Sequence, residues 1–214
     1  MMIPSAEYAL YAKTLIGVLA IINPVGAIPV FLSLCSDRTS IERKQIAGAS
    51  AVAVAVVLIV ATWAGEIILA FFGIGLPAFR VGGGILILLM AINMLLAKQS
   101  HARQSPEEAH EASSKENIAV VPLAIPLMAG PGAISLVIID ANQAAGWSGR
   151  VILSAGIVAV AVTVWLALRM ATPIGNKLRI TGLNIVTRVM GLLLAAIGVQ
   201  MIAVGLVKLL PGLA

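Results

Sequence analysis

The chain has 214 residues, of which 60% are hydrophobic and only 11% are charged, and its net charge is +5. Soluble domains carry about 25% charged residues, so this composition excludes a soluble globular domain and indicates an integral membrane protein. Cys35 is the only cysteine, which excludes an intramolecular disulfide and a thiolate metal cluster.

Six charge-free runs follow one another along the chain, each close to the length that a helix needs to cross about 30 Å of hydrocarbon. Their hydrophobicity is continuous rather than alternating, which predicts helices and not barrel strands. The runs cover residues 14–35, 45–65, 81–97, 117–139, 151–168 and 189–207. We therefore expect an all-α, polytopic membrane protein with six transmembrane helices.

The first run is interrupted by Asn23, Pro24, Gly26 and Pro29. Proline has no backbone N–H and glycine permits unusual backbone angles, so a helix should break here. Unpaired backbone groups are costly in lipid, and transporters use broken helices to bind substrates. Carbonyls freed at the end of the first half-helix can hold an ammonium or a cation, and N–H groups freed at the start of the second suit a carboxylate. These four residues form the first part of a candidate substrate-binding site.

Gly130, Pro131 and Gly132 interrupt the fourth run in the same way and complete the candidate site. The ends of two broken helices suit a zwitterion, and the small residues near both breaks favour a ligand with a small side chain. The alternative is that both breaks are kinks used only for packing. No metal or organic cofactor is expected at this site.

The two halves of the chain resemble each other, which indicates an internal repeat. Gly26-Ala27-Ile28 recurs as Gly132-Ala133-Ile134, and Arg80-Val81 recurs as Arg188-Val189 after nearly the same offset. Each half holds three spans, so the second half should enter the membrane from the opposite side. The sequence therefore predicts an inverted 3+3 repeat with helices 1 and 4 broken. The predicted parts of this single membrane domain are a first repeat at 1–97, a cytoplasmic linker at 98–116 and a second repeat at 117–214.

Four charged residues near the ends of the predicted spans are candidates for gating or ion pairing. Arg80 and Arg188 each open a span, where each could gate the site, clamp a carboxylate or only reach the lipid headgroups. Glu66 ends the second span on the same face as Arg80, so the two can form an ion pair. Asp140 closes the fourth span, either as a solvated carboxylate or as a group drawn inward.

The driving ion is left open by the sequence. No charged residue lies in the middle of a span, so proton coupling would require Glu66 or Asp140 to be drawn inward, or the substrate itself to help carry the proton. Sodium could instead use backbone carbonyls together with Asn23. Most Lys and Arg residues follow the first, third and fifth spans, which places these loops in the cytoplasm and both termini outside it.

Four ordered motifs identify a family that the chain resembles. They are Asn-Pro-Val-Gly-Ala-Ile-Pro-Val-Phe at 23–31, Phe-Arg-Val-Gly-Gly-Gly at 79–84, the segment 122–134, and Asn-Ile-Val-Thr-Arg-Val-Met-Gly-Leu at 184–192. In this order they resemble the MarC family over essentially the whole chain, and the bacterial inner-membrane branch most closely. Some relatives are described as transporters of glycine and alanine driven by an ion gradient. The resemblance implies a multi-pass inner-membrane protein with that activity, driven by H⁺ or Na⁺.

Other functions are weighed against a secondary transporter of small neutral amino acids. A membrane enzyme is not expected, because no nucleophile–base pair or metal cluster is visible. A channel and a structural or stress-related membrane protein remain alternatives. Drug efflux is not favoured, because aromatic residues make up only 4% of the chain. The expected partners are the lipid bilayer and a small-molecule substrate, with a homo-oligomer possible and no nucleic acid, since the basic residues are spread along the membrane edges.

Overall fold

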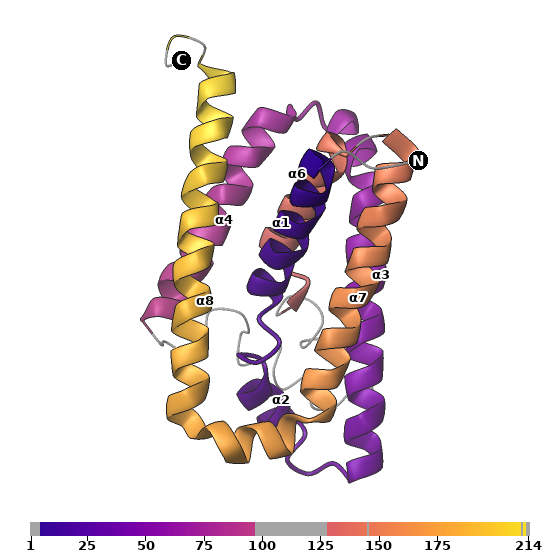
Figure 1. The fold of residues 1–214 in the computed structure, drawn as a ribbon, viewed down its shortest axis with the longest axis vertical. Helices are drawn as coiled ribbons and strands as arrows, with labels where there is room; N and C mark the ends of the chain where they lie inside the picture. The colour runs from indigo at the N-terminus through magenta and orange to yellow at the C-terminus, as the bar shows by residue number, and fades with distance from the viewer. Residues whose placement is uncertain (1–4, 97–127, 145, 211, 213–214) are drawn as a thin grey trace.

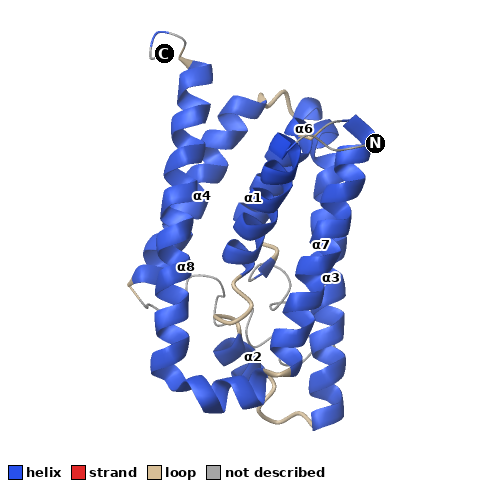
Figure 2. Cartoon of the chain, in the orientation of Figure 1, coloured by secondary structure: helices blue, strands red, loops and turns tan. Residues whose placement is uncertain are grey.

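A computed structural model describes residues 5–96, 128–144, 146–210 and 212. The described part is all-helical and contains no strand, as predicted (Figure 2). Its helices are α1 (Ser5–Ile22), α2 (Ile28–Leu34), α3 (Ser40–Phe71), α4 (Leu76–Leu95), α6 (Pro131–Gln143), α7 (Gly146–Arg169) and α8 (Ala171–Leu209).

Four stretches of the described helices are long and apolar enough to cross a membrane. They are α3, α4, α7 and residues Thr181–Leu209 of α8. The predicted break in the first run is present, whereas the count of six spans stays a prediction. The first predicted run is divided between α1 and α2, and only residues from 128 onward of the fourth run are described. The physical reason in the first run is Pro24, which cannot donate the backbone hydrogen bond that would continue α1.

Capping explains why α3 begins before the charge-free run at 45–65. Thr39 Oγ1 accepts a hydrogen bond from the Glu42 N–H at 3.3 Å, and Glu42 Oε2 accepts one from the Thr39 N–H at 2.7 Å. This reciprocal capping box satisfies backbone donors that a helix start otherwise leaves unpaired. The helix therefore extends through polar residues that a hydrophobic run does not include.

Helix α8 also begins far earlier than the predicted sixth run. Arg188, predicted to open a span, instead lies well inside α8. Figure 1 shows the first turns of α8 running across the lower end of the molecule before the helix turns upward. These turns pack on α2, because a Cβ added at Gly175 would lie 3.1 Å from Cδ1 of Leu32.

The long helices pack as two antiparallel pairs. Helix α4 packs chiefly against α8, and α3 packs chiefly against α7. Residue order runs in opposite directions in the first pair: a Cβ at Gly84 would lie 2.8 Å from the Gly198 carbonyl, and one at Gly205 would lie 2.6 Å from Val81. In the second pair, Trp63 donates to Ser154 Oγ at 3.1 Å and also packs edge-on against Trp147.

Helices α1 and α6 lie between these two pairs (Figure 1). Helix α1 contacts α6, α7 and α8, whereas α6 contacts α1, α3 and α4. The buried core follows this centre, while large apolar side chains such as Ile67 and Phe71 of α3 are exposed on the outside. Exposed apolar side chains on membrane-spanning helices face lipid, so the arrangement suits a bilayer.

Candidate functional site

The first interruption is a tight turn between α1 and α2. Asn23 adopts a left-handed conformation with φ of 43°, and its Oδ1 accepts a hydrogen bond from the Gly26 N–H at 3.1 Å. Asparagine tolerates this conformation better than most residues, and its short side chain can satisfy a neighbouring backbone group. A Cβ at Gly26 would lie only 2.0 Å from Asn23 Nδ2, so only glycine fits beneath the Asn23 side chain.

The turn leaves polar backbone groups available at the end of α1. The carbonyl of Ala20 would normally accept from the residue four positions later, but that residue is Pro24, which has no N–H. Pro24 is buried, and Pro29 lies in the first turn of α2. The side-chain Nδ2 of Asn23 donates no hydrogen bond within the described part of the chain. The end of α1 therefore offers backbone carbonyls, such as that of Ala20, as acceptors and the Asn23 Nδ2 group as a donor.

The second interruption lies at the start of α6. Gly130 is extended, with φ of −76° and ψ of 178°, and it precedes the helix without a side-chain cap. Pro131 in the first turn is exposed, whereas Gly132 and Ala133 are buried. The first N–H groups of a helix have no partner within the helix, and a helix start carries a partial positive charge. Gly132 and Ala133 therefore present backbone donors that suit a carboxylate.

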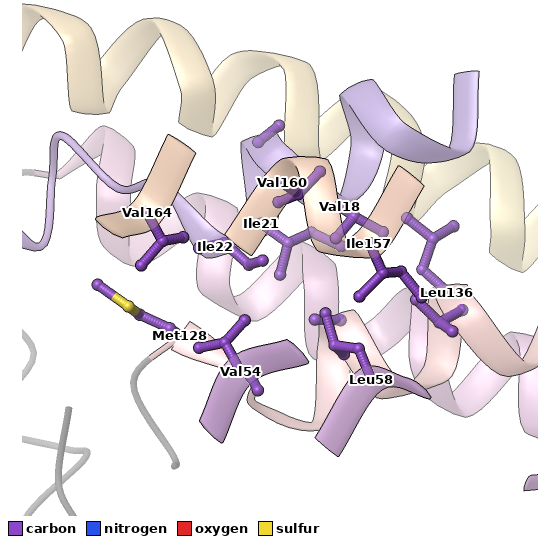
Figure 3. Close-up of a cluster of buried hydrophobic side chains, with 14 of the residues drawn as sticks. Val18, Ile21, Ile22, Val54, Leu58, Met128, Leu136, Ile157, Val160 and Val164 are labelled. Atoms are coloured by element: carbon purple, nitrogen blue, oxygen red, sulfur yellow. The ribbon is translucent and has the colours of Figure 1, made fainter. Parts of the chain in front are cut away.

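The two interruptions lie side by side because α1 and α6 pack antiparallel. A Cβ at Gly132 would lie 3.7 Å from Cγ2 of Ile21, and one at Gly17 would lie 2.9 Å from Leu136. The structure thus brings the end of α1 next to the start of α6, as the sequence analysis required for a shared site. Figure 3 shows Ile21 and Ile22 in one buried cluster with Met128, which precedes the second break.

Buried apolar side chains pack around this junction. Two cavities are lined by other described residues, and neither includes Asn23 or Gly132. One cavity, of about 430 Å³, is apolar and lies between α3, α4 and α6, with Ile134 and Ile138 among its lining residues. The other, of about 360 Å³, lies at the lower end of the molecule and is basic. Met128, Ile21 and Ile22 fill the space near the breaks.

Asp140 is drawn into the α1–α6 contact. Its Oδ2 accepts a hydrogen bond from the Thr14 hydroxyl at 2.8 Å, and Thr14 is buried. Lys13 and Arg80 lie close enough to act on this carboxylate electrostatically. The sequence left open whether Asp140 is a solvated carboxylate or is drawn inward, and the hydrogen bond to buried Thr14 favours the second alternative. Asp140 lies three turns along α6 from the break, so it belongs to the same helix as the candidate site.

The predicted pair between Glu66 and Arg80 is wrong. Glu66 instead accepts from Arg150 Nη2 and, at 3.0 Å, from Asn142 Nδ2. The reason is topological, because α3 packs against α7 and α6 rather than against its sequence neighbour α4. Arg188 is exposed on α8 and makes no ion pair with any described residue. Of the four charged candidates, Arg80 lies near enough to act on the charge of Asp140, whereas Glu66 pairs with Arg150 and Arg188 is exposed.

Sequence reasoning missed the polar partners that come from other helices. Thr14 opens the first charge-free run, and Arg150 immediately precedes the fifth, so both are visible in the sequence as span-end residues. Nothing in the sequence says which carboxylate each one meets, because that depends on how the helices pack. A search for hydroxyl and amide residues at the ends of each span would have included Thr14.

The fold and the site together define a polytopic α-helical membrane protein in which the end of α1 meets the start of α6 at the centre. Comparison with known proteins names the family within this class. The chain belongs to the MarC family of integral membrane proteins, and the match covers residues 8–210.

Relatives in distant bacteria match the chain over nearly its whole length. The UPF0056 membrane protein YhcE of Escherichia coli (strain K12) is 40% identical, covering 97% of this chain and 96% of the relative. The UPF0056 membrane protein YvbG of Bacillus subtilis (strain 168) is 37% identical, covering 95% and 97%. A UPF0056 membrane protein of Aquifex aeolicus (strain VF5) is 36% identical, covering 94% of both chains. No solved structure matches the chain.

Proposed function

We propose that this protein is a secondary transporter of small neutral amino acids of the glycine or alanine type, working by alternating access in a bacterial inner membrane. The observation that carries the proposal is the meeting of two helix ends, with Ile21 at the end of α1 against Gly132 at the start of α6. Broken helices at the centre of a membrane protein are a recurring way to build a substrate site in transporters.

The chemistry of the helix ends suits a zwitterion. The N–H groups of Gly132 and Ala133 would bind the carboxylate, and carbonyls such as that of Ala20 would accept from the ammonium group. Asn23 supplies an amide at the end of α1. The binding set predicted from sequence, Asn23, Pro24, Gly26, Pro29, Gly130, Pro131 and Gly132, is retained in this proposal. Close packing around Gly132, where a Cβ would lie 3.1 Å from Ile87 and Met90, favours a small substrate.

The helix pairing supports an inverted 3+3 repeat. If residues 1–97 and 117–214 are inverted copies, α3 corresponds to α7 and α4 to α8. Each of these pairs packs together in opposite directions. Inverted repeats in transporters allow one half to rock against the other around a central site.

Asp140 is our candidate for the coupling group. It is the carboxylate that contacts a buried hydroxyl in the α1–α6 packing, whereas Glu66 is held by Arg150 and Asn142 at an exposed position. Ionisable groups drawn into a membrane protein commonly carry protons in transporters. In this proposal a proton on Asp140 moves with the substrate.

Transport in proteoliposomes tests the proposal. Purified protein is reconstituted, and uptake of labelled glycine and alanine is measured with an imposed proton or sodium gradient, with protein-free liposomes as control. We expect gradient-stimulated uptake of at least one small neutral amino acid and exchange of labelled for unlabelled substrate. No flux of any small neutral amino acid under either gradient would contradict the proposal. Transport of far more molecules per second than a carrier can move would indicate a channel instead.

The proposal also places both termini outside the cytoplasm, following the positive-inside rule. A reporter fused after Ala214 should be active if it requires the periplasm and silent if it requires the cytoplasm. Activity of the cytoplasmic reporter alone would show that the C-terminus lies in the cytoplasm and would contradict this orientation.

A further inference from the structure

A basic pocket of about 360 Å³ lies at the lower end of the molecule, away from the interrupted helices. It is formed where α2 and α7 end and where α3 and α8 begin. Its basic and hydroxyl side chains are Arg38, Arg43, Lys44, Arg169, Ser40 and Thr172. These residues come from two distant parts of the sequence, so the fold assembles the pocket.

Most of the positive charge in the basic pocket is not neutralised by carboxylates of the described residues. Arg43 donates from Nε to the Arg38 carbonyl at 3.1 Å and from Nη2 to the Ser36 carbonyl at 3.0 Å. These neutral acceptors fix the guanidinium in place and leave its charge uncompensated. Arg169 lies over the Trp165 ring at 5.1 Å, and Lys44 is exposed without an ion pair to any described residue.

The acidic residues nearby compensate only part of this charge. Glu42 approaches Arg38 at 3.5 Å, but its other carboxylate oxygen accepts from Thr39 in the capping box. Asp37 is exposed, and neither carboxylate lines the basic pocket. Three cations therefore remain to attract an anion.

The beginnings of two helices add to the attraction. Ser40 is the first residue of α3, and Thr172 is the second residue of α8. The start of a helix carries a partial positive charge and backbone N–H groups suited to phosphate. Two hydroxyl donors and two helix starts thus lie beside the guanidinium and ammonium groups.

The basic pocket lies at the ends of two candidate membrane spans, where lipid headgroups would meet water. Ser40 begins one candidate membrane span and Arg169 ends another. Exposed apolar side chains lie next to the basic residues in the chain, namely Ile41, Leu166 and Met170. Basic pockets between transmembrane helices near the cytoplasmic surface bind anionic lipid headgroups, and flanking apolar side chains suit their acyl chains.

We propose that the basic pocket binds a phosphate group, presented by the headgroup of an anionic phospholipid. Arg43 and Arg169 would contact the phosphate oxygens, with Lys44 as a mobile third cation, because guanidinium groups match phosphate geometry. The volume of the pocket falls within the range of about 300–1,000 Å³ that is common for small-ligand sites. The buried ring of Phe31 closes its inner end.

Native mass spectrometry of the purified full-length protein tests this site. Phosphatidylglycerol and phosphatidylcholine are titrated into delipidated protein, and the bound fractions are compared. We expect selective retention of phosphatidylglycerol, weakened about tenfold or more in the double variant Lys44→Gln, Arg169→Gln. The control is Lys208→Gln, which removes an exposed cation near the far end of α8 and should leave retention unchanged.

A second arm distinguishes the sources of the phosphate. Inorganic phosphate is added as a competitor at matched ionic strength. Failure to displace phosphatidylglycerol supports a lipid headgroup, whereas displacement at millimolar concentration keeps the phosphate site but overturns the lipid as its source. Equal retention by the double variant and the Lys208→Gln control, or equal retention of the two lipids, would overturn the proposal. Lys44→Gln alone changes an exposed residue, so its weakened retention would support the site even if the double variant failed to fold.

Discussion

Asn23 joins two roles in one residue. Its left-handed conformation ends α1, and its side chain closes the turn over Gly26. The same side chain has an Nδ2 group free of described protein partners at the junction with α6. A backbone role and a ligand role can therefore be separated by choosing replacements that keep one and remove the other.

Replacing Asn23 by glycine or alanine makes this separation. Glycine adopts the left-handed conformation freely, whereas alanine there costs about 1–2 kcal/mol. We expect Asn23→Gly to lose most of the substrate uptake. Its Tm should fall only slightly, because the lost hydrogen bond lowers the free energy of unfolding by about 1 kcal/mol. Asn23→Ala should lower both. Gly48→Ala, at a position where a Cβ would meet nothing within 4 Å, is the matched control. Full uptake by Asn23→Gly would reduce Asn23 to a turn residue.

Asp140 makes a second prediction at this scale. Asp140→Asn keeps a hydrogen-bonding side chain next to Thr14 but removes the charge and the site of protonation. We expect this variant to retain exchange of labelled for unlabelled substrate and to lose stimulation by a pH gradient. Asp37→Asn, at an exposed position outside the bundle, should leave both intact. If Asp140→Asn still concentrates substrate in response to a pH gradient, Asp140 is structural.

At the scale of elements, the crossing of α4 and α8 depends on glycine. A Cβ at Gly84 would lie 2.8 Å from the Gly198 carbonyl, and one at Gly198 would lie 2.9 Å from the Gly84 carbonyl. Small residues let membrane helices approach until their backbones touch, which improves van der Waals packing. The contact is reciprocal, so neither helix can take a side chain here without moving away from the other.

Gly84→Ala and Gly82→Ala test this crossing as a pair. We expect Gly84→Ala to destabilise the protein by about 1–3 kcal/mol, the usual cost of overpacking. Gly82→Ala should be neutral or slightly stabilising, because its Cβ would meet nothing within 4 Å and alanine favours the helix. Thermal unfolding in detergent, followed by circular dichroism, measures both. Equal melting temperatures for the two variants would mean that α4 and α8 can move apart at Gly84 without loss of stability.

The elements also show what could be predicted from sequence. The break at Asn23 and Pro24 was predictable, because proline removes a specific donor wherever the chain runs. The starts of α3 and α8 were not, because charge-free runs report lipid exposure and helices continue through polar residues. The partner of Glu66 could not be predicted either. Consecutive helices were assumed to be neighbours, whereas α3 packs against α7. Local chemistry could be read from the sequence, but pairing between distant helices could not.

At the scale of the whole molecule, the two halves are interlocked. Helices α1 to α4 pack mainly against α6, α7 and α8 rather than against one another. The predicted linker at 98–116 joins these halves but lies outside the described residues. Each half would therefore leave most of its packing surface exposed if made alone.

Splitting the chain within 98–116 tests the interlocking. Residues 1–97 and 117–214, produced together, should co-purify through a tag on one half, whereas each half produced alone should be degraded or aggregated. Gly84→Ala in the first half should weaken co-purification more than Gly82→Ala. A stable, monodisperse first half on its own would contradict this account.

Because the halves pack against each other, the first half must wait in the membrane until the second half has been synthesised. At about 5–20 residues per second, a ribosome needs roughly 6–23 s to extend the chain from the end of α4 to the end of α8. During that interval four helices reside in the bilayer without their final neighbours, and the turn at Asn23 exposes polar backbone to lipid. The newly inserted first half is consequently a substrate for membrane chaperones and proteases, and slow translation of the second half should lower the yield of the protein.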